Sequence, residues 1–203
     1  MYVKGAKKAE QAVQTRRLLL DVARSLFAAH GYAGTSTEEV VQQASVTRGA
    51  LYHHFRNKRA LFAAVADDLE RELSEHVIAA GAAESGLWEQ QRAGIAAFLD
   101  ACLDPAIHQI LLLDGPSVLG WQAWRALDAR YGLGILIAGL TALIEAGEIE
   151  QQPVEPLAGL LLGALTEGGL MIARAPDVQA ARGEVGAGVD RLFMGLRAPP
   201  ARP

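Results

Sequence analysis

The sequence predicts an all-α protein, with a small N-terminal three-helix unit and a larger C-terminal helical bundle. Apolar residues recur at three- and four-residue spacing along nearly the whole chain, which is the period of an amphipathic helix. No segment shows the period-two alternation of a β-strand. Basic residues gather toward the N-terminus. Hydrophobic residues make up 51% of the 203 residues, enough for a well-buried core.

The first two helices are recognised by the residues at their ends. The first helix carries an apolar face from Leu18 to Phe27 and is expected to end at His30-Gly31, because glycine readily adopts a left-handed cap. The second helix is opened by the stretch 35–39, Thr-Ser-Thr-Glu-Glu. Within it Ser36 and Glu39 form a capping box, in which each side chain accepts from the backbone amide of the other residue.

A short break at residues 45–47 precedes a third helix, expected over about Arg48 to Phe55. Asn57 then caps a long fourth helix, from Lys58 to about Ile78. After a loop of small residues, further helices are expected at about 87–103, 105–113, 117–130, 132–146, 155–175 and 177–196. We therefore divide the chain into an N-terminal arm and three-helix domain (1–57) and a helical body (58–203).

The two parts differ in charge. The net charge of the whole chain is −4, which by itself argues against a polyanionic partner. Residues 1–64, however, contain ten Lys and Arg and four acidic residues, a net charge of +6, and the remainder carries −10. A basic end on an acidic body is expected where only that end meets a polyanion such as double-stranded DNA. Chance clustering of solvated charges gives the same count.

Two short helices joined by a tight break inside a basic three-helix unit are the pattern of a helix-turn-helix. On the third helix, Leu51 and Phe55 continue the apolar core face. Another side of the same helix carries Arg48, Gly49, Tyr52 and His53. That side is polar and small at its start, and it contains no acid, which suits entry into the major groove. Such a helix contacts bases through its N-terminal residues, here Thr47, Arg48 and Ala50.

Residues 15–63 resemble the DNA-binding domain of the TetR family of bacterial regulators. The resemblance rests on Phe27-Ala28-Ala29-His30-Gly31-Tyr32, Thr35-Ser36-Thr37-Glu38-Glu39-Val40, Val46-Thr47-Arg48-Gly49-Ala50-Leu51-Tyr52-His53-His54-Phe55 and Asn57-Lys58. It implies that Thr35 and Thr37 contact phosphates and that Tyr52 and Lys58 hold the DNA backbone. It further implies that Thr47, Arg48, Ala50 and His53 face the bases, and that Gly49 permits close approach.

The chain departs from the family pattern at two positions. Ser45 stands where the family usually has glycine in the turn, and a non-glycine residue with positive φ costs about 1 kcal/mol or more. Ala50 stands where a hydroxyl residue is common, so it can touch a thymine methyl but cannot donate a hydrogen bond. Outside the motif, Tyr52 would be a half-buried core aromatic and His53-His54 a solvated pair. These adjacent histidines face different directions and make a poor metal site.

The body resembles C-terminal regulatory domains of the same family, at residues 114–117 and 120–125. It is expected to hold a pocket for a largely hydrophobic small-molecule effector between its helices. The candidate lining residues are Phe98, Cys102, His108, Leu112, Trp121, Trp124 and Met171. For any one of them, an ordinary role in the core is the more common explanation.

The last two helices are the expected dimer surface. Glycines interrupt the leucine-rich eighth helix, and a glycine inside a helix costs about 1 kcal/mol, which close approach of a partner helix would explain. The candidate interface residues are Gly159, Gly163, Val185, Val189, Leu192 and Phe193. A homodimer on a pseudopalindromic operator is expected, because one helix-turn-helix reads few base pairs. The family further implies a cytoplasmic repressor that a ligand releases from DNA.

The sequence argues against two other classes of protein. An all-helical enzyme is disfavoured, because no nucleophile elbow, phosphate-binding loop or metal-ligand cluster is recognised, and nothing orients Cys102 toward His108. An architectural DNA binder is disfavoured by the large apolar body. No catalytic residue, metal or cofactor is therefore expected. No signal peptide is expected within residues 1–30, and the longest uncharged apolar run, Gly132–Ile144, is too short to span a bilayer.

Overall fold

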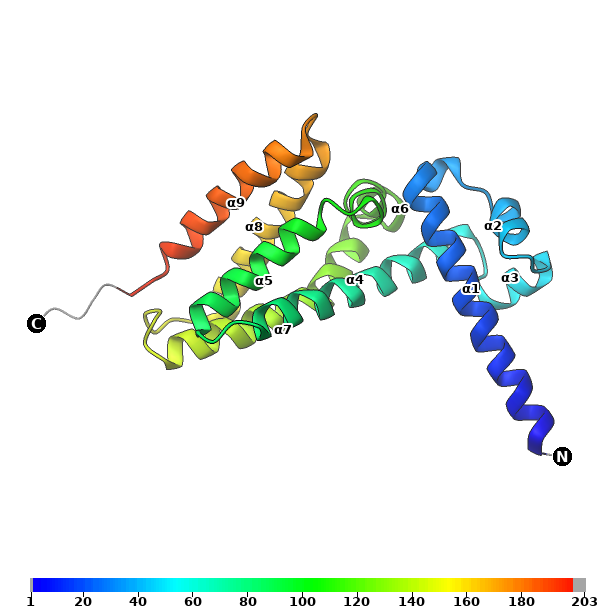
Figure 1. The fold of residues 1–203 in the computed structure, drawn as a ribbon, viewed down its shortest axis with the longest axis horizontal. Helices are drawn as coiled ribbons and strands as arrows, with labels where there is room; N and C mark the ends of the chain where they lie inside the picture. Colours follow the sequence, from blue (N-terminus) through cyan, green and yellow to red (C-terminus); the bar gives the residue numbers. More distant parts are fainter. Residues whose placement is uncertain (1, 199–203) are drawn as a thin grey trace, which may run out of the picture.

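The computed structural model describes residues 2–198, with side chains from residue 9 onward, and the described chain is helical without a β-strand (Figure 1). The all-α prediction is confirmed. In chain order the elements are α1 (Tyr2–Gly34), α2 (Thr37–Gln43), α3 (Arg48–His54), α4 (Lys58–Ala82), α5 (Leu87–Ala101), the π-helical segment η1 (Ile107–Asp114), α6 (Gly115–Leu119), α7 (Trp121–Glu145), α8 (Val154–Arg174) and α9 (Val178–Met194). The side chains of Lys4, Lys7 and Lys8, in the expected N-terminal arm, lie outside the described residues.

The first three helices form a head at one end of an elongated molecule (Figure 1). Gly31 takes the expected left-handed conformation, with φ of 68°, and kinks the end of α1. Ser36 accepts a hydrogen bond from the amide of Glu39, which is the first half of the expected capping box. Ser45 adopts a φ of 51°, so the turn before α3 keeps a left-handed residue although it lacks glycine. The helix-turn-helix geometry therefore survives the substitution, at the local cost of a Cβ in the left-handed region.

The long helix α4 belongs to both parts of the molecule. It begins beside the head, where the Asn57 side chain accepts from the amide of Ala60 at 2.8 Å, and runs on between the helices of the body (Figure 1). The expected boundary at residue 57 thus falls on the N-cap of this helix. Because one continuous helix joins head to body, a change in its direction inside the body displaces the head.

Two predicted helix boundaries in the body are wrong. We expected separate helices at 117–130 and 132–146, but α7 continues through Gly132, and the break falls at Gly120, with φ of 82°. Gly132 serves packing instead: an added Cβ would lie 3.0 Å from the Cδ1 atom of Leu162 on α8. The segment predicted as a helix at 105–113 is the π-helical η1, which continues directly into α6.

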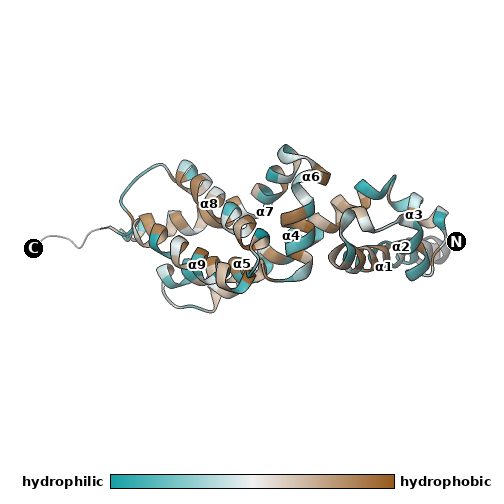
Figure 2. Cartoon of the chain, turned by 90° about the horizontal axis from the view of Figure 1, so that it is seen from above, coloured by the Kyte–Doolittle hydropathy of each residue, from teal (hydrophilic) through white to brown (hydrophobic). Residues whose placement is uncertain are grey.

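The two most apolar helices, α7 and α8, are each long and hydrophobic enough to cross a membrane by length and composition. In the structure they pack against each other within the body (Figure 2). In the most apolar 18-residue stretch of each helix, 56% is buried inside the protein in α8 and only 28% in α7. Several residues between 128 and 142 of α7 also line a partly open cavity described below.

Substitution of the α4 cap provides a test of the joint between the parts. We predict that Asn57→Ala lowers the free energy of unfolding by about 1 kcal/mol, because the amide of Ala60 loses its acceptor. Asn57→Asp, which retains a side-chain oxygen, is the matched control and should stay close to the wild type. Urea unfolding measures both, and equal losses in the two variants would contradict the capping role.

Candidate nucleic-acid interface and internal cavity

The outer face of α3 is open to a partner. Thr47, Arg48, Gly49, Tyr52 and His53 are all exposed, and Ala50 is half-buried. On the opposite side of the helix, Leu51 is fully buried in the core. A Cβ added to Gly49 would meet nothing closer than the Thr47 hydroxyl, at 3.9 Å. The packing of this protein therefore does not require glycine there, and the free space lies on the outer side.

A small polar network ties this face to the start of α2. The Arg48 guanidinium lies 3.6 Å from the Glu38 carboxylate and over the Tyr52 ring, at 5.5 Å from its centroid. The Tyr52 hydroxyl lies 3.4 Å from that of Thr37, and this hydrogen bond, with the nearby Arg48, lowers the pKa of Tyr52. The face expected to be free of acid thus has one carboxylate beside it, contributed by α2. Both partners of the ion pair are largely exposed, so separating them costs little.

Two of the residues expected to contact phosphate are engaged inside the head. Thr35 is 2% exposed, and its hydroxyl donates to the carbonyl of Gly31. The Lys58 ammonium donates to the carbonyls of Tyr32 at 2.7 Å and Thr35 at 2.8 Å. Burial leaves the Thr35 side chain no free surface for phosphate. Lys58 caps the last carbonyls of α1 in this structure and would have to give up these bonds to reach DNA.

Several basic residues of the N-terminal segment 1–64 are engaged within the protein. Arg17 pairs with Asp68 at 2.8 Å, and Arg24 pairs with Glu72, both on α4. Arg59 donates to the carbonyls of Val118 and Leu119 at the end of α6, each at 2.8 Å. The charge count of the N-terminal segment therefore overstates the positive charge available to an external polyanion.

The head is also tied to η1. The backbone amide of Tyr32 donates to the Asp114 carboxylate at 2.7 Å, and the same oxygen accepts from the Gln109 side chain at 3.1 Å. Asp114 ends η1, and π-helical segments are frequent at functional sites. The position of the head thus depends on a segment that also lines the interior of the body.

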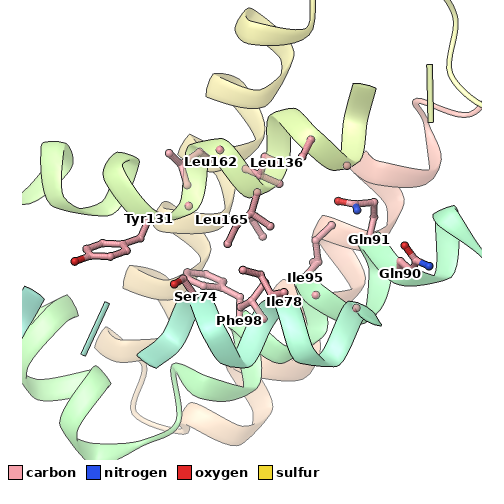
Figure 3. A pocket seen from close by; sticks show the side chains of 18 of the residues that line it. Ser74, Ile78, Gln90, Gln91, Ile95, Phe98, Tyr131, Leu136, Leu162 and Leu165 are labelled. Atoms are coloured by element: carbon pink, nitrogen blue, oxygen red, sulfur yellow. The ribbon is translucent and has the colours of Figure 1, made fainter. Parts of the chain in front are cut away.

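A cavity of about 590 Å³ lies between α4, α5, α7 and α8 (Figure 3). Its walls are largely aliphatic, with Phe98, Tyr131, Ile78 and Leu165 among the larger side chains. Polar groups enter from Ser74, Gln90, Gln91, Glu70 and Asp128. Among the residues whose side chains the structure describes, neither Lys nor Arg is present in the lining. The volume lies within the range of small-molecule pockets.

The predicted pocket residues are distributed over three places. Phe98 lines the cavity. Cys102, Leu112 and Trp124 line a small adjoining void, in which the Trp124 indole donates to the carbonyl of Leu111 at 2.8 Å. His108, Trp121 and Met171 line neither space. Trp121 and Met171 are instead exposed, at 59% and 56%. Sequence spacing identified apolar helix faces here but could not tell which face closes around a cavity.

Cys102 does not have the properties of a nucleophile. It is fully buried, and its thiol donates to the carbonyl of Phe98 at 3.3 Å. Burial raises the pKa of this thiol to about 12, so the reactive thiolate is scarce at neutral pH. Among the described residues there is no cluster of three or more His, Cys, Asp or Glu able to hold a metal ion.

Glu70 on α4 was missed in the sequence and is the most unusual residue of the cavity. It is 8% exposed and lines both the cavity and the small void. Burial, followed by repulsion from Asp128 and Asp67, raises the pKa of Glu70 to about 8. The signal that could have identified it is its helix face, because Glu70 lies four residues after Ala66 and three before Leu73, on the buried side of α4.

Asp128, by contrast, has partners. Its carboxylate accepts from Arg125 at 2.6 Å and from Thr166 at 2.9 Å. Burial raises the pKa of Asp128, and the hydrogen bond from Thr166 and the charge of Arg125 oppose this rise. Asp128 is therefore paired with a basic residue, Arg125, whereas Glu70 has no basic partner among the described residues.

The outer surface of α8 and α9 carries exposed apolar side chains and open glycines. Gly159 and Gly163 have open space where a Cβ would lie, and Leu160 and Leu192 are 74% and 61% exposed. Other candidate interface residues point inward. Val189 is buried, and Phe193 is stacked on Trp88 with ring centroids 4.4 Å apart. Val185 packs beside Gly168 within the same subunit.

The comparisons with known proteins cover both parts of the chain. The family model for bacterial regulatory proteins of the tetR family matches residues 19–65. The model for the tetracyclin repressor-like C-terminal domain matches residues 88–196. A crystal structure of a TetR-family transcriptional regulator from Pectobacterium atrosepticum is 34% identical, with 94% of this chain and 98% of that chain covered and a TM-score of 0.86.

Two further proteins are similar over most of their length. The HTH-type transcriptional regulator SrpR of Pseudomonas putida is 29% identical over 86% of this chain and 82% of its own. The crystal structure of RolR in complex with resorcinol shares the fold at 19% identity, covering 91% of this chain and 89% of that chain with a TM-score of 0.70.

The raised pKa of Glu70 leads to a prediction about pH and stability. The carboxyl is protonated in the folded state up to about pH 8 but ionises near its ordinary pKa of 4.5 when the chain unfolds. Unfolding therefore releases a proton between these values, and stability falls as pH rises, by at most about 1.4 kcal/mol per pH unit. We predict that Glu70→Gln removes this loss, so that its stability advantage over the wild type grows from pH 5 to pH 8.

Chemical denaturation at several pH values measures this difference. Glu145→Gln is the matched control, because Glu145 is exposed at the end of α7 and lines neither the cavity nor the void. A constant difference between Glu70→Gln and the wild type across the pH range would contradict the prediction.

Proposed function

The chain belongs to the TetR family of bacterial regulatory proteins, and we propose that it is a DNA-binding repressor. In this proposal it binds its operator as a homodimer, and a small molecule releases it from the DNA. The observation that carries the proposal is the open outer face of α3, which offers Thr47, Arg48, Tyr52 and His53 beside an accessible Gly49. Such a face fits the major groove, where guanidinium and hydroxyl groups contact base edges. The relatives are regulators, which supports a role without catalysis, in the cytoplasm where the DNA lies.

Within this proposal the head residues have different roles. Arg48, Thr47, Ala50 and His53 face the bases, whereas Thr37 and Tyr52 contact the backbone. Thr35 acts indirectly, since its buried hydroxyl holds the end of α1. Lys58 reaches phosphate only after leaving the carbonyls of Tyr32 and Thr35.

A second copy of the chain is proposed to cover the outer face of α8 and α9. Leu160, Met171 and Leu192 are exposed on this face, next to the open glycines Gly159 and Gly163. Two-fold pairing of these helices would bury the apolar side chains and use the glycines for close approach of the backbones. Val189 and Phe193 are buried beneath this face and would not contact the partner.

Release by a ligand is proposed to act through η1 and α4. Leu111 and Ile107 of η1 line the void beside the cavity, and Asp114 at its end holds the amide of Tyr32. A ligand that favours one position of η1 over another would shift the head, and the half-sites on DNA are fixed at roughly 34–36 Å per helical turn. The complex of RolR with resorcinol supports the idea that this fold accommodates a small aromatic molecule.

The DNA-binding face can be tested with a charge-neutral change at Glu38. We predict that Glu38→Gln tightens DNA binding several-fold at low salt, because it removes a carboxylate beside Arg48 that would repel phosphate, and that added salt reduces this gain. Arg48→Ala should weaken binding and change base preference. Electrophoretic mobility shifts on fragments selected from the genome of origin measure both, with Glu145→Gln as control. Unchanged affinity in both head variants would refute the assignment of α3.

Salt dependence provides a further test of the same interface. Affinity for the operator should fall by a factor on the order of a thousand between 50 and 200 mM salt if about six phosphates are neutralised. A fall much smaller than this would mean that the pairing of Arg17 and Arg24 with α4 persists on DNA and leaves fewer free cations.

The dimer surface can be tested with an added charge. We predict that Gly163→Arg produces monomers and abolishes operator binding, because the arginine would occupy the space needed by the partner helix. Gln151→Arg adds the same charge at an exposed position before α8 and should leave the dimer intact. Sedimentation velocity measures the oligomeric state, and an unaltered dimer for Gly163→Arg would place the interface elsewhere.

A further inference from the structure

Glu70 is a buried carboxyl group without a partner. It is 8% exposed, and no ion pair or side-chain hydrogen bond to it is found among the described residues. Charged side chains that are buried in proteins are normally paired, because removing an ion from water costs several kcal/mol. The described residues therefore provide no basic partner for Glu70, and its carboxyl stays protonated near pH 7 in the free protein.

The surroundings of Glu70 supply no counter-charge. None of the described residues that line the cavity is Lys or Arg. Arg125 on α7 is already paired with Asp128 at 2.6 Å. Asp67 on α4 pairs with Arg130 at 2.7 Å. The other ionisable groups nearby are the Cys102 thiol, whose pKa is raised to about 12, and Tyr131, whose pKa is also raised, so both are neutral near pH 7.

We propose that the cavity takes a lipophilic cation: a molecule with an apolar body that fills the space between α4, α5 and α7, and one ammonium group that pairs with the Glu70 carboxylate. The proposal deepens the proposed function and rests on it, since it specifies the chemical class of the effector. The body of such a molecule would meet Ile78, Ile95, Phe98 and Leu165 (Figure 3). Phe98 lines both spaces that Glu70 lines, so its ring can add a cation–π attraction.

The position of Glu70 also places the ligand beside η1. The void that Glu70 shares with the cavity is lined by Ile107 and Leu111 of η1, the segment that ends at Asp114. A cation that pairs with Glu70 from the cavity side can therefore act on η1 through the Glu70 side chain, which lines both spaces, while its apolar body contacts α4. A neutral apolar ligand confined to the outer part of the cavity would lack this contact.

The pairing has a defined pH dependence. The pKa of Glu70 in the free protein is about 8, so below that value a cation must first displace a proton. For a quaternary ammonium, which does not titrate, affinity should rise by about tenfold per pH unit below pH 8 and level off above it. A neutral ligand of the same shape should bind independently of pH in this range.

The experiment compares three probes with the same phenylbutyl body: 4-phenylbutyltrimethylammonium, 4-phenylbutanol and 4-phenylbutanoate. Isothermal titration calorimetry is carried out on the full-length wild type, on Glu70→Gln and on the control Glu145→Gln, between pH 6.5 and 8.5. We expect the cation to bind most tightly and the anion least. Glu70→Gln should weaken cation binding at least tenfold at pH 8 and remove its pH dependence, whereas 4-phenylbutanol should bind both proteins within twofold.

Three results would overturn the proposal. The first is that 4-phenylbutanol binds the wild type as tightly as the cation or more tightly. The others are an unchanged cation affinity in Glu70→Gln and a wild type that binds none of the probes. The thermal unfolding of each variant shows that it is folded. Operator binding without any probe is measured in parallel. A protein that binds its operator but not the cation refutes this inference alone, whereas one that binds the cation but no specific DNA refutes the proposed function.

Discussion

The arrangement of the molecule depends on the hydrogen bond between the Tyr32 amide and the Asp114 carboxylate. Tyr32 directly follows Gly31, whose left-handed conformation kinks the end of α1 where the helix meets η1. A part-buried amide at this kink needs an acceptor, and the Asp114 carboxylate at the end of η1 provides one. Two bonds from Arg59 at the start of α4 to the carbonyls ending α6 hold the next part of the chain to the same region of the body. The head is therefore held by the segment that follows α5.

This constraint connects the interior of the body with the surface of the head. Leu111 of η1 accepts a hydrogen bond from Trp124 through its carbonyl and lines the void that contains Glu70. Phe27, Tyr32 and Phe62 pack edge to face or stacked at the junction of α1 and α4. Contacts thus run without interruption from the cavity through η1 to the base of the head. Coupling between distant sites requires a contiguous path of this kind, with elements that can occupy two positions.

The fold determines which charged residues are paired and which remain available to a partner. Arg17 and Arg24 count toward a basic head in the sequence, yet both pair with carboxylates of α4. Glu38, which the spacing of α3 alone could not reveal, lies beside Arg48. Glu70 is one of nineteen acidic residues in the body segment but differs from most of them, because it is buried without a cation. Local sequence gives the number of charges, whereas their partners come from helices distant in the chain.

The helical fold, the turn before α3 and the exposed face of α3 could be predicted from the sequence, because each depends on residues within a few positions of one another. Gly31, Ser36 and Asn57 mark helix ends, and the spacing of Leu51 and Phe55 sets the buried side of α3. Only the tertiary structure decided that Gly132 continues α7, that Phe98 but not Trp121 or Met171 lines the cavity, and that Val189 and Phe193 point inward. An apolar helix face packs equally well against a core, a cavity or a partner. Which of the three it meets depends on the crossing of helices far apart in the chain, which periodicity does not encode.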